Sequence, residues 1–181
     1  MKTKVTLLSL IATSLAFGQL KTPQASPLSK IEQTIGMTTI SIEYSRPSKR
    51  GRNVFPDVVK NDEVWRTGAN ENTKISTSDI LIFDKDTLQA GEYALYTKPM
   101  KDSWEVYFYK ETSNWGTPQK WDNDKVALTI TTPIEKLENT VETFTIGFND
   151  LTTKSGHLSL MWDKTAISIP FQLNTVDEVV T

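Results

Sequence analysis

The sequence contains no cysteine, a single histidine, and only eight glycines and eight prolines among its 181 residues. The absence of cysteine excludes disulfide bonds, thiolate nucleophiles and zinc or iron–sulfur centres bound by cysteine. One histidine is too few for a typical zinc site. The low glycine and proline contents exclude a collagen-like or low-complexity chain. We therefore predict no metal site and no cofactor.

The chain also lacks an excess of either charge, with 20 Lys and Arg against 22 Asp and Glu. A net charge of −2 offers no electrostatic basis for binding nucleic acid. The hydrophobic content of 38% and the charged content of 23% are those of a globular protein. The length corresponds to about one domain.

The first residues have the pattern of a secretory signal peptide. Met1–Lys4 carries two lysines, Val5–Phe17 is an uncharged and mostly apolar run, and Ala16 and Gly18 are small. The apolar run is shorter than the roughly 20 residues that span a bilayer, and no later segment is longer. We therefore predict a signal peptide at residues 1–19 and an exported protein, periplasmic or secreted, with no membrane span after its removal. A buried N-terminal helix is the alternative.

Strand-like patterns dominate the chain beyond an extended lead-in at residues 20–29. Thr38–Tyr44 alternates polar and apolar side chains, with the two-residue period of a half-buried strand. Further short segments of this kind occupy residues 73–83, 92–97, 103–109, 125–131, 141–148, 157–162 and 166–173. We predict an all-β fold, a single β-sandwich or jelly-roll-like domain over residues 30–175, followed by a C-terminal tail at 176–181.

Helices have little room in this pattern. Only Pro56–Asn61 and Ile134–Leu137 leave space for a turn or two. A parallel α/β fold would need helices of about 10–15 residues between its strands. Pro170 has no N–H to donate, so it predicts an edge position or a bulge in the last strand.

The connection from Ser45 to Asn72 is the segment that looks least like a purely structural part of the fold. It is longer than most loops without structure of their own, which are usually functional. Its basic side chains include Arg46, Lys49, Arg50, Arg52 and Arg66. Guanidinium groups bind carboxylate, phosphate or sulfate through paired hydrogen bonds. A second interpretation stays open, in which Arg46 and Arg66 pair with Glu63 or Glu71 and pin the loop.

The end of this connection, Trp65–Asn72, is densely polar. Gly68 permits a tight backbone turn. Asn70 and Glu71 supply the donors and acceptors that sugar or amide recognition needs. Trp65 fits a place in the core beneath the loop better than ligand stacking. Trp115, in a later polar loop, is predicted either to stack on a carbohydrate or to anchor its loop.

Several motifs occur together along the chain. They are Tyr44–Ser48 (YSRPS), Gly51-Arg52, Trp65–Glu71 (WRTGANE), Leu88-x-Ala90-Gly91-x-Tyr93-x-Leu95, Asn114-Trp115-Gly116, Val141–Phe144 (VETF) and a closing strand with Trp162. Together they resemble a family of exported bacterial proteins, domain of unknown function 2911, from about Pro27 to Phe171. The resemblance implies a secreted or periplasmic protein of Bacteroidota-type bacteria and supplies no catalytic residues.

The chemistry for catalysis is sparse. His157 is the only histidine, and the chain has no Gly-x-Ser-x-Gly elbow of a serine hydrolase. A glycosidase would need two carboxyl groups, one of them with a raised pKa. Glu71 is the best candidate for one of them, with Glu63 or Glu43 as a weaker partner.

The sequence favours a non-catalytic, exported β protein that binds a small anionic or carbohydrate-like ligand or an envelope protein. The alternatives are a carboxylate-based hydrolase of extracellular or envelope polysaccharide and a purely structural envelope protein. The predicted ligand-binding residues are Arg46, Arg52, Trp65, Arg66, Asn70, Glu71 and Trp115. No catalytic residue is assigned, and Glu71 is the best candidate if the protein is an enzyme.

Overall fold

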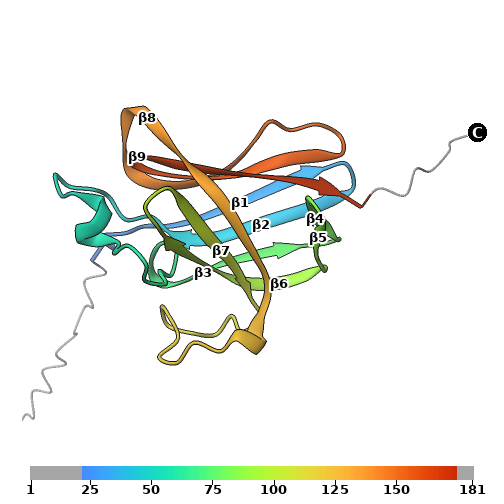
Figure 1. Ribbon diagram of the computed structural model, residues 1–181, viewed down its shortest axis with the longest axis horizontal. Helices are drawn as coiled ribbons and strands as arrows, with labels where there is room; N and C mark the ends of the chain where they lie inside the picture. Colours follow the sequence, from blue (N-terminus) through green and yellow to red (C-terminus); the bar gives the residue numbers. More distant parts are fainter. Residues whose placement is uncertain (1–21, 175–181) are drawn as a thin grey trace, which may run out of the picture.

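A computed structural model describes residues 22–174 of the chain (Figure 1). The predicted signal peptide at residues 1–19 and the predicted tail at 176–181 lie outside the described residues. No helix within residues 22–174 is long and apolar enough to cross a membrane.

The described residues form nine strands and two short helical turns. In chain order these are β1 (Leu28–Ile35), β2 (Thr38–Ser45), η1 (Val54–Val58), β3 (Ala69–Thr77), β4 (Leu81–Phe83), β5 (Asp86–Leu88), β6 (Gly91–Pro99), β7 (Ser103–Tyr109), η2 (Asn123–Lys125), β8 (Val126–Asn149) and β9 (Ser155–Leu173). The predicted all-β fold is confirmed. β1 takes in the last two residues of the predicted lead-in.

All nine strands belong to one antiparallel sheet, in the order β1-β2-β3-β6-β7-β8-β9-β4-β5. The sheet curls over, because β2 and β8 are not neighbours in it and yet their side chains meet. The rings of Tyr44 and Phe144 lie 5.8 Å apart, and the Tyr44 hydroxyl accepts a hydrogen bond from the backbone N–H of Ile146 at 2.9 Å. In Figure 1, β8 and β9 lie over β1 and β2. One curled sheet therefore supplies the two facing layers.

The core lies inside this curl. Ile40, Ile42 and Tyr44 are buried on one face of β2, as their alternation predicts. Phe144 of β8 and Trp162 of β9 face them from the other half of the sheet and are also buried. Apolar burial of this kind, without disulfides, is what stabilises the fold.

The last four predicted strands form only two long strands in the structure, β8 and β9. β8 pairs first with β7 and then with β9, and its pairing with β9 changes register twice. The segment Ile134–Leu137, which the sequence leaves open for a helical turn, is strand, since Ile134 pairs with Ile167. Pro170 lies between that pair and the Ile82–Gln172 pair with β4, where its missing N–H breaks no ladder.

Candidate functional site

The β2–β3 connection is attached to both halves of the sheet. Ser48 forms a β-bridge with Thr143 of β8, and Trp65 forms one with Thr97 of β6. Lys49 adds an ion pair to Asp163 of β9 at 2.6 Å. The connection, with η1 in its middle, lies at the end of the molecule where the described chain begins (Figure 1).

A tight turn ends the connection and starts β3. Gly68 has a φ of +157°, and a Cβ there would lie 2.9 Å from the carbonyl oxygen of Ser45 and 3.1 Å from Thr73 Oγ1. Thr73 Oγ1 also donates a hydrogen bond to the Thr67 carbonyl at 2.6 Å. The predicted tight turn is therefore present, and close backbone approach requires glycine at its centre.

Trp65 packs into the core beneath this turn. Its indole stacks on Trp162, with ring centroids 5.8 Å apart and an interplanar angle of 19°, and it meets Trp104 and Phe144 at steeper angles. The indole N–H donates to the carbonyl of Gly68 at 3.1 Å. This arrangement agrees with the core interpretation of Trp65, which is half-buried and leaves part of its surface on a cavity.

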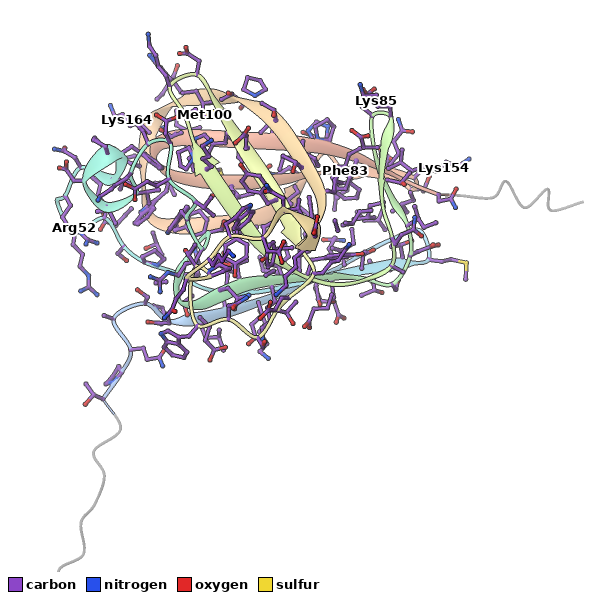
Figure 2. The ribbon with its side chains drawn as sticks, turned by 60° about the horizontal axis from the view of Figure 1, so that its bottom comes forward. Arg52, Phe83, Lys85, Met100, Lys154 and Lys164 are labelled. Atoms are coloured by element: carbon purple, nitrogen blue, oxygen red, sulfur yellow. The ribbon has the colours of Figure 1, made fainter. Side chains whose placement is uncertain are left out.

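This cavity, which we call the arginine cavity, has a volume of about 440 Å³. Its lining includes Arg50, Arg52, Trp65, Arg66, Asn70 and Trp162. Among the described residues, no Asp, Glu, His or Lys lines it. Figure 2 shows Arg52 at this end of the molecule.

The three arginines of the cavity bond to neutral backbone carbonyls. Arg50 Nη2 donates to Ala25 at 2.9 Å, Arg52 donates to Ser48 at 2.8 Å and to Lys49 at 3.0 Å, and Arg66 Nη1 donates to Asn70 at 2.8 Å. Within residues 22–174 no arginine forms an ion pair with a carboxylate. No carboxylate of the described residues therefore neutralises their positive charge by direct contact.

The predicted alternative, internal pairing of arginines with acids, is not what the structure contains. Glu63 pairs with Lys60 at 3.7 Å instead. The backbone N–H of Arg50, and not its guanidinium, donates to Glu142 Oε1 at 2.8 Å. Arginine pins the loop through carbonyl oxygens, an outcome that sequence cannot anticipate because every residue offers such an acceptor.

Arg46 lies outside the arginine cavity. Its guanidinium crosses to β8, where Nε donates to the Phe144 carbonyl at 3.1 Å and Nη2 donates to Thr145 Oγ1 at 2.8 Å. Arg46 thus joins the end of β2 to β8 and has a structural role here.

The Arg66 guanidinium lies against the loop that follows β7. A Cβ on Gly116 would fall 3.0 Å from Arg66 Nη1, and the carbonyl of Gly116 accepts a hydrogen bond from the Tyr96 hydroxyl at 3.1 Å. Burial raises the pKa of Tyr96 to about 12, with smaller raising effects from Tyr109 and Glu111. Tyr96 therefore stays neutral at physiological pH and acts as a donor.

The lead-in of the chain closes one side of the site. Asn70 Nδ2 lies 3.3 Å from the carbonyl of Ser26, 3.4 Å from Gln24 Oε1 and 3.1 Å from Ser45 Oγ. Asn70 has a φ of +60°, a value that asparagine tolerates better than most residues. The Asn70 amide thus holds the lead-in against the turn.

Glu71 and Trp115 lie apart from the arginine cavity. Both border a smaller hollow of about 120 Å³, which Asn70 also lines. The predicted site therefore divides into Arg52, Trp65, Arg66 and Asn70 on the cavity, and Glu71 and Trp115 beside it. The prediction missed Arg50 and Trp162; Arg50 belongs to the basic cluster, and Trp162 to the closing-strand motif, so both had a sequence signal.

The described residues give little support for catalysis. His157 Nδ1 lies 3.0 Å from Ser168 Oγ and 3.4 Å from Asp150 Oδ2. A catalytic triad needs the serine and the acid on opposite ring nitrogens, and here both meet the same one. Glu43 and Glu71 border the same hollow, but Glu43 is already paired with Lys30 at 2.5 Å. No group of three or more acidic or histidine side chains within residues 22–174 is arranged to hold a metal ion.

These features define a class: a single-sheet all-β protein with a basic, tryptophan-walled cavity at the β2–β3 connection. A family model described as "Protein of unknown function (DUF2911)" matches residues 26–171, and the chain belongs to this family. The resemblance to domain of unknown function 2911 that the motifs indicate is thereby confirmed. No curated protein and no solved structure matches the chain.

Proposed function

We propose that the protein binds a small anionic ligand, carrying a carboxylate, phosphate or sulfate group, in the arginine cavity. The observation that carries the proposal is that Arg50, Arg52 and Arg66 line one cavity, without an acidic residue in its lining and without a carboxylate partner. Unpaired positive charge gathered beside low-dielectric walls attracts anions.

The arginines keep donors available for a ligand. A guanidinium carries five N–H groups, and the hydrogen bonds described above use one or two of them on each residue. Trp65, backed by the buried Trp162, supplies an apolar wall that strengthens electrostatic contacts. A volume of about 440 Å³ lies in the usual range for a small-molecule site.

Binding without catalysis is the better proposal for this cavity. A general acid or base must lie within hydrogen-bond reach of the reacting group, and within residues 22–174 no Asp, Glu, His or Lys lines the cavity. The hydrolase alternative would have to use Glu71, which borders a different hollow.

We also propose that the protein is exported, on the strength of the signal-peptide pattern in residues 1–19. Cell fractionation followed by N-terminal sequencing tests this. The mature chain is expected outside the cytoplasm with its first residue near Gln19 or Leu20. A full-length chain that stays in the cytoplasm would contradict export and leave the binding proposal untouched.

The binding proposal is tested by thermal unfolding with phosphate, sulfate, citrate and glucuronate, and with neutral sugars for comparison. A ligand at 100 times its dissociation constant stabilises by about 2.7 kcal/mol, which shifts the midpoint of a domain of this size by roughly 5–10 °C. Arg52→Gln should remove most of the shift. Lys85→Gln removes the same charge on the opposite side of the molecule and should keep it (Figure 2). No shift with any anion would reject the proposal.

A further inference from the structure

Trp115 is exposed to an unusual degree for a tryptophan. Its side chain is 72% exposed, and it is the only aromatic among the large exposed hydrophobic residues of the described chain. None of the close ring contacts within residues 22–174 involves it, whereas Trp65, Trp104, Trp121 and Trp162 all have ring partners. The indole therefore contributes little to the core.

Two hollows border Trp115. One has a volume of about 120 Å³ and the other of about 220 Å³, and Glu71 and Lys74 border both of them together with Trp115. β3 supplies the two charged residues, and the loop after β7 supplies the tryptophan. The indole thus borders both hollows, together with a carboxylate and an ammonium group.

An unpaired buried atom lies beside the same feature. Asn72, which lines the smaller hollow, is only 4% exposed. Its Nδ2 donates to the carbonyl of Thr112 at 3.3 Å, but its Oδ1 has no hydrogen-bond partner, the one such buried side-chain atom found within residues 22–174. Buried polar atoms almost always have a partner, so the wall of the smaller hollow holds an acceptor whose hydrogen-bonding capacity is unmet.

We propose that Trp115 and the two hollows beside it bind a neutral oligosaccharide. A sugar ring offers an apolar face that packs on an indole, and hydroxyl groups that both donate and accept hydrogen bonds. Those hydroxyls donate to Glu71 and accept from Lys74, which border both hollows.

The charges at this site explain the choice of a neutral chain over an anion. Glu43 and Glu71 oppose Lys74 in the smaller hollow, so it has no excess of positive charge, unlike the arginine cavity. Two hollows that share Trp115, Glu71 and Lys74 suit a chain of two or more sugar units better than a single sugar. The site is therefore separate from the proposed anion site, although Asn70 borders both.

The test is isothermal titration of the full-length protein, as recovered after expression, with cellohexaose, chitohexaose and mannohexaose. Concentrations of about 10 mM detect a dissociation constant near 1 mM. At least one of the three is expected to bind, and Trp115→Ala should weaken it at least tenfold. Glu71→Gln, which keeps the shape of an exposed side chain, should weaken it severalfold.

Met37→Ala is the matched control. Met37 is 97% exposed and lies at the β1–β2 turn, at the other end of these strands from the Leu28–Ser45 pair that adjoins the hollow. The Met37→Ala substitution removes a comparable exposed apolar side chain and should leave sugar binding unchanged.

Three results would overturn the inference: no binding of any of the sugars, binding that Trp115→Ala does not weaken, or self-association that depends on Trp115 in sedimentation without sugar binding. Phosphate is titrated in parallel as the probe for the arginine cavity. Phosphate binding without sugar binding would reject this inference alone, and sugar binding without phosphate binding would reject only the anion proposal.

Discussion

Trp65 and Trp162 stack nearly parallel, with their ring centroids 5.8 Å apart, and so join the β2–β3 connection to β9, the last strand of the described chain. The two residues are far apart in sequence, and both lie within the family match and within motifs of the sequence, Trp65–Glu71 and the closing strand. Because Trp162 is fully buried, the position of Trp65 is set by the core. The arginine cavity thus has one rigid wall.

Trp65→Ala should destabilise the protein strongly. It removes contacts with Trp104, Phe144 and Trp162 and leaves a void, for which about 3 kcal/mol is a typical cost. Urea denaturation measures the change. Trp115→Ala is the control, with an expected change within about 0.5 kcal/mol because that side chain is exposed. Equal effects of the two substitutions would contradict the core role of Trp65.

Gly68→Ala should destabilise more than Gly51→Ala. Both glycines have positive φ, +157° and +72°, but nothing lies within 4 Å of a Cβ on Gly51, whereas one on Gly68 would press on Ser45 and Thr73. We expect about 1 kcal/mol at Gly51 from backbone strain alone, and about 3 kcal/mol or more at Gly68. Thermal and urea unfolding of the two variants give the comparison. A Gly68→Ala protein as stable as Gly51→Ala would show that the turn can widen.

Stability should fall between about pH 10 and pH 12. Burial raises the pKa of Tyr96 from 10.0 to about 12, and it raises the pKa of Tyr93 and, with the help of Glu105, that of Tyr107. These phenols bind their protons more tightly when folded, so their contribution is complete below pH 10 and is lost as the pH rises through the folded pKa. Urea unfolding across this range measures the slope, which Tyr96→Phe should reduce. A slope unchanged by that substitution would contradict the assignment.

The coupling free energy between Lys49 and Asp163 should be larger than that of an exposed ion pair. Its side chains are 22% and 19% exposed, against 68% and 64% for Lys60–Glu63. A double-mutant cycle with Lys49→Gln and Asp163→Asn should give a coupling of about 1–2 kcal/mol, and the corresponding cycle at Lys60 and Glu63 about 0–0.5 kcal/mol. Similar values for the two pairs would mean that Lys49 does not fasten the connection to β9.

The local pattern of the chain was enough to predict the fold class. The alternation of polar and apolar residues in Thr38–Tyr44 indicates which face of that strand meets the core. This pattern can be read from the segment alone, without knowledge of distant residues. The two-residue period did not predict the bounds of very short or very long strands. β5 has only three residues, too few to show a period. In β8 the pairing changes register, so the alternation of side chains is interrupted although the strand continues.

The site was predictable only in part, for a related reason. The sequence alone determined that positive charge gathers in one connection, that Gly68 makes a tight turn and that Trp65 belongs to the core. Tertiary structure decided that Arg46 turns away to Phe144, 98 residues distant, and that Glu71 and Trp115 share a hollow of their own. The curl of the sheet brings such groups together, and the direction of each side chain depends on partners that no local pattern encodes.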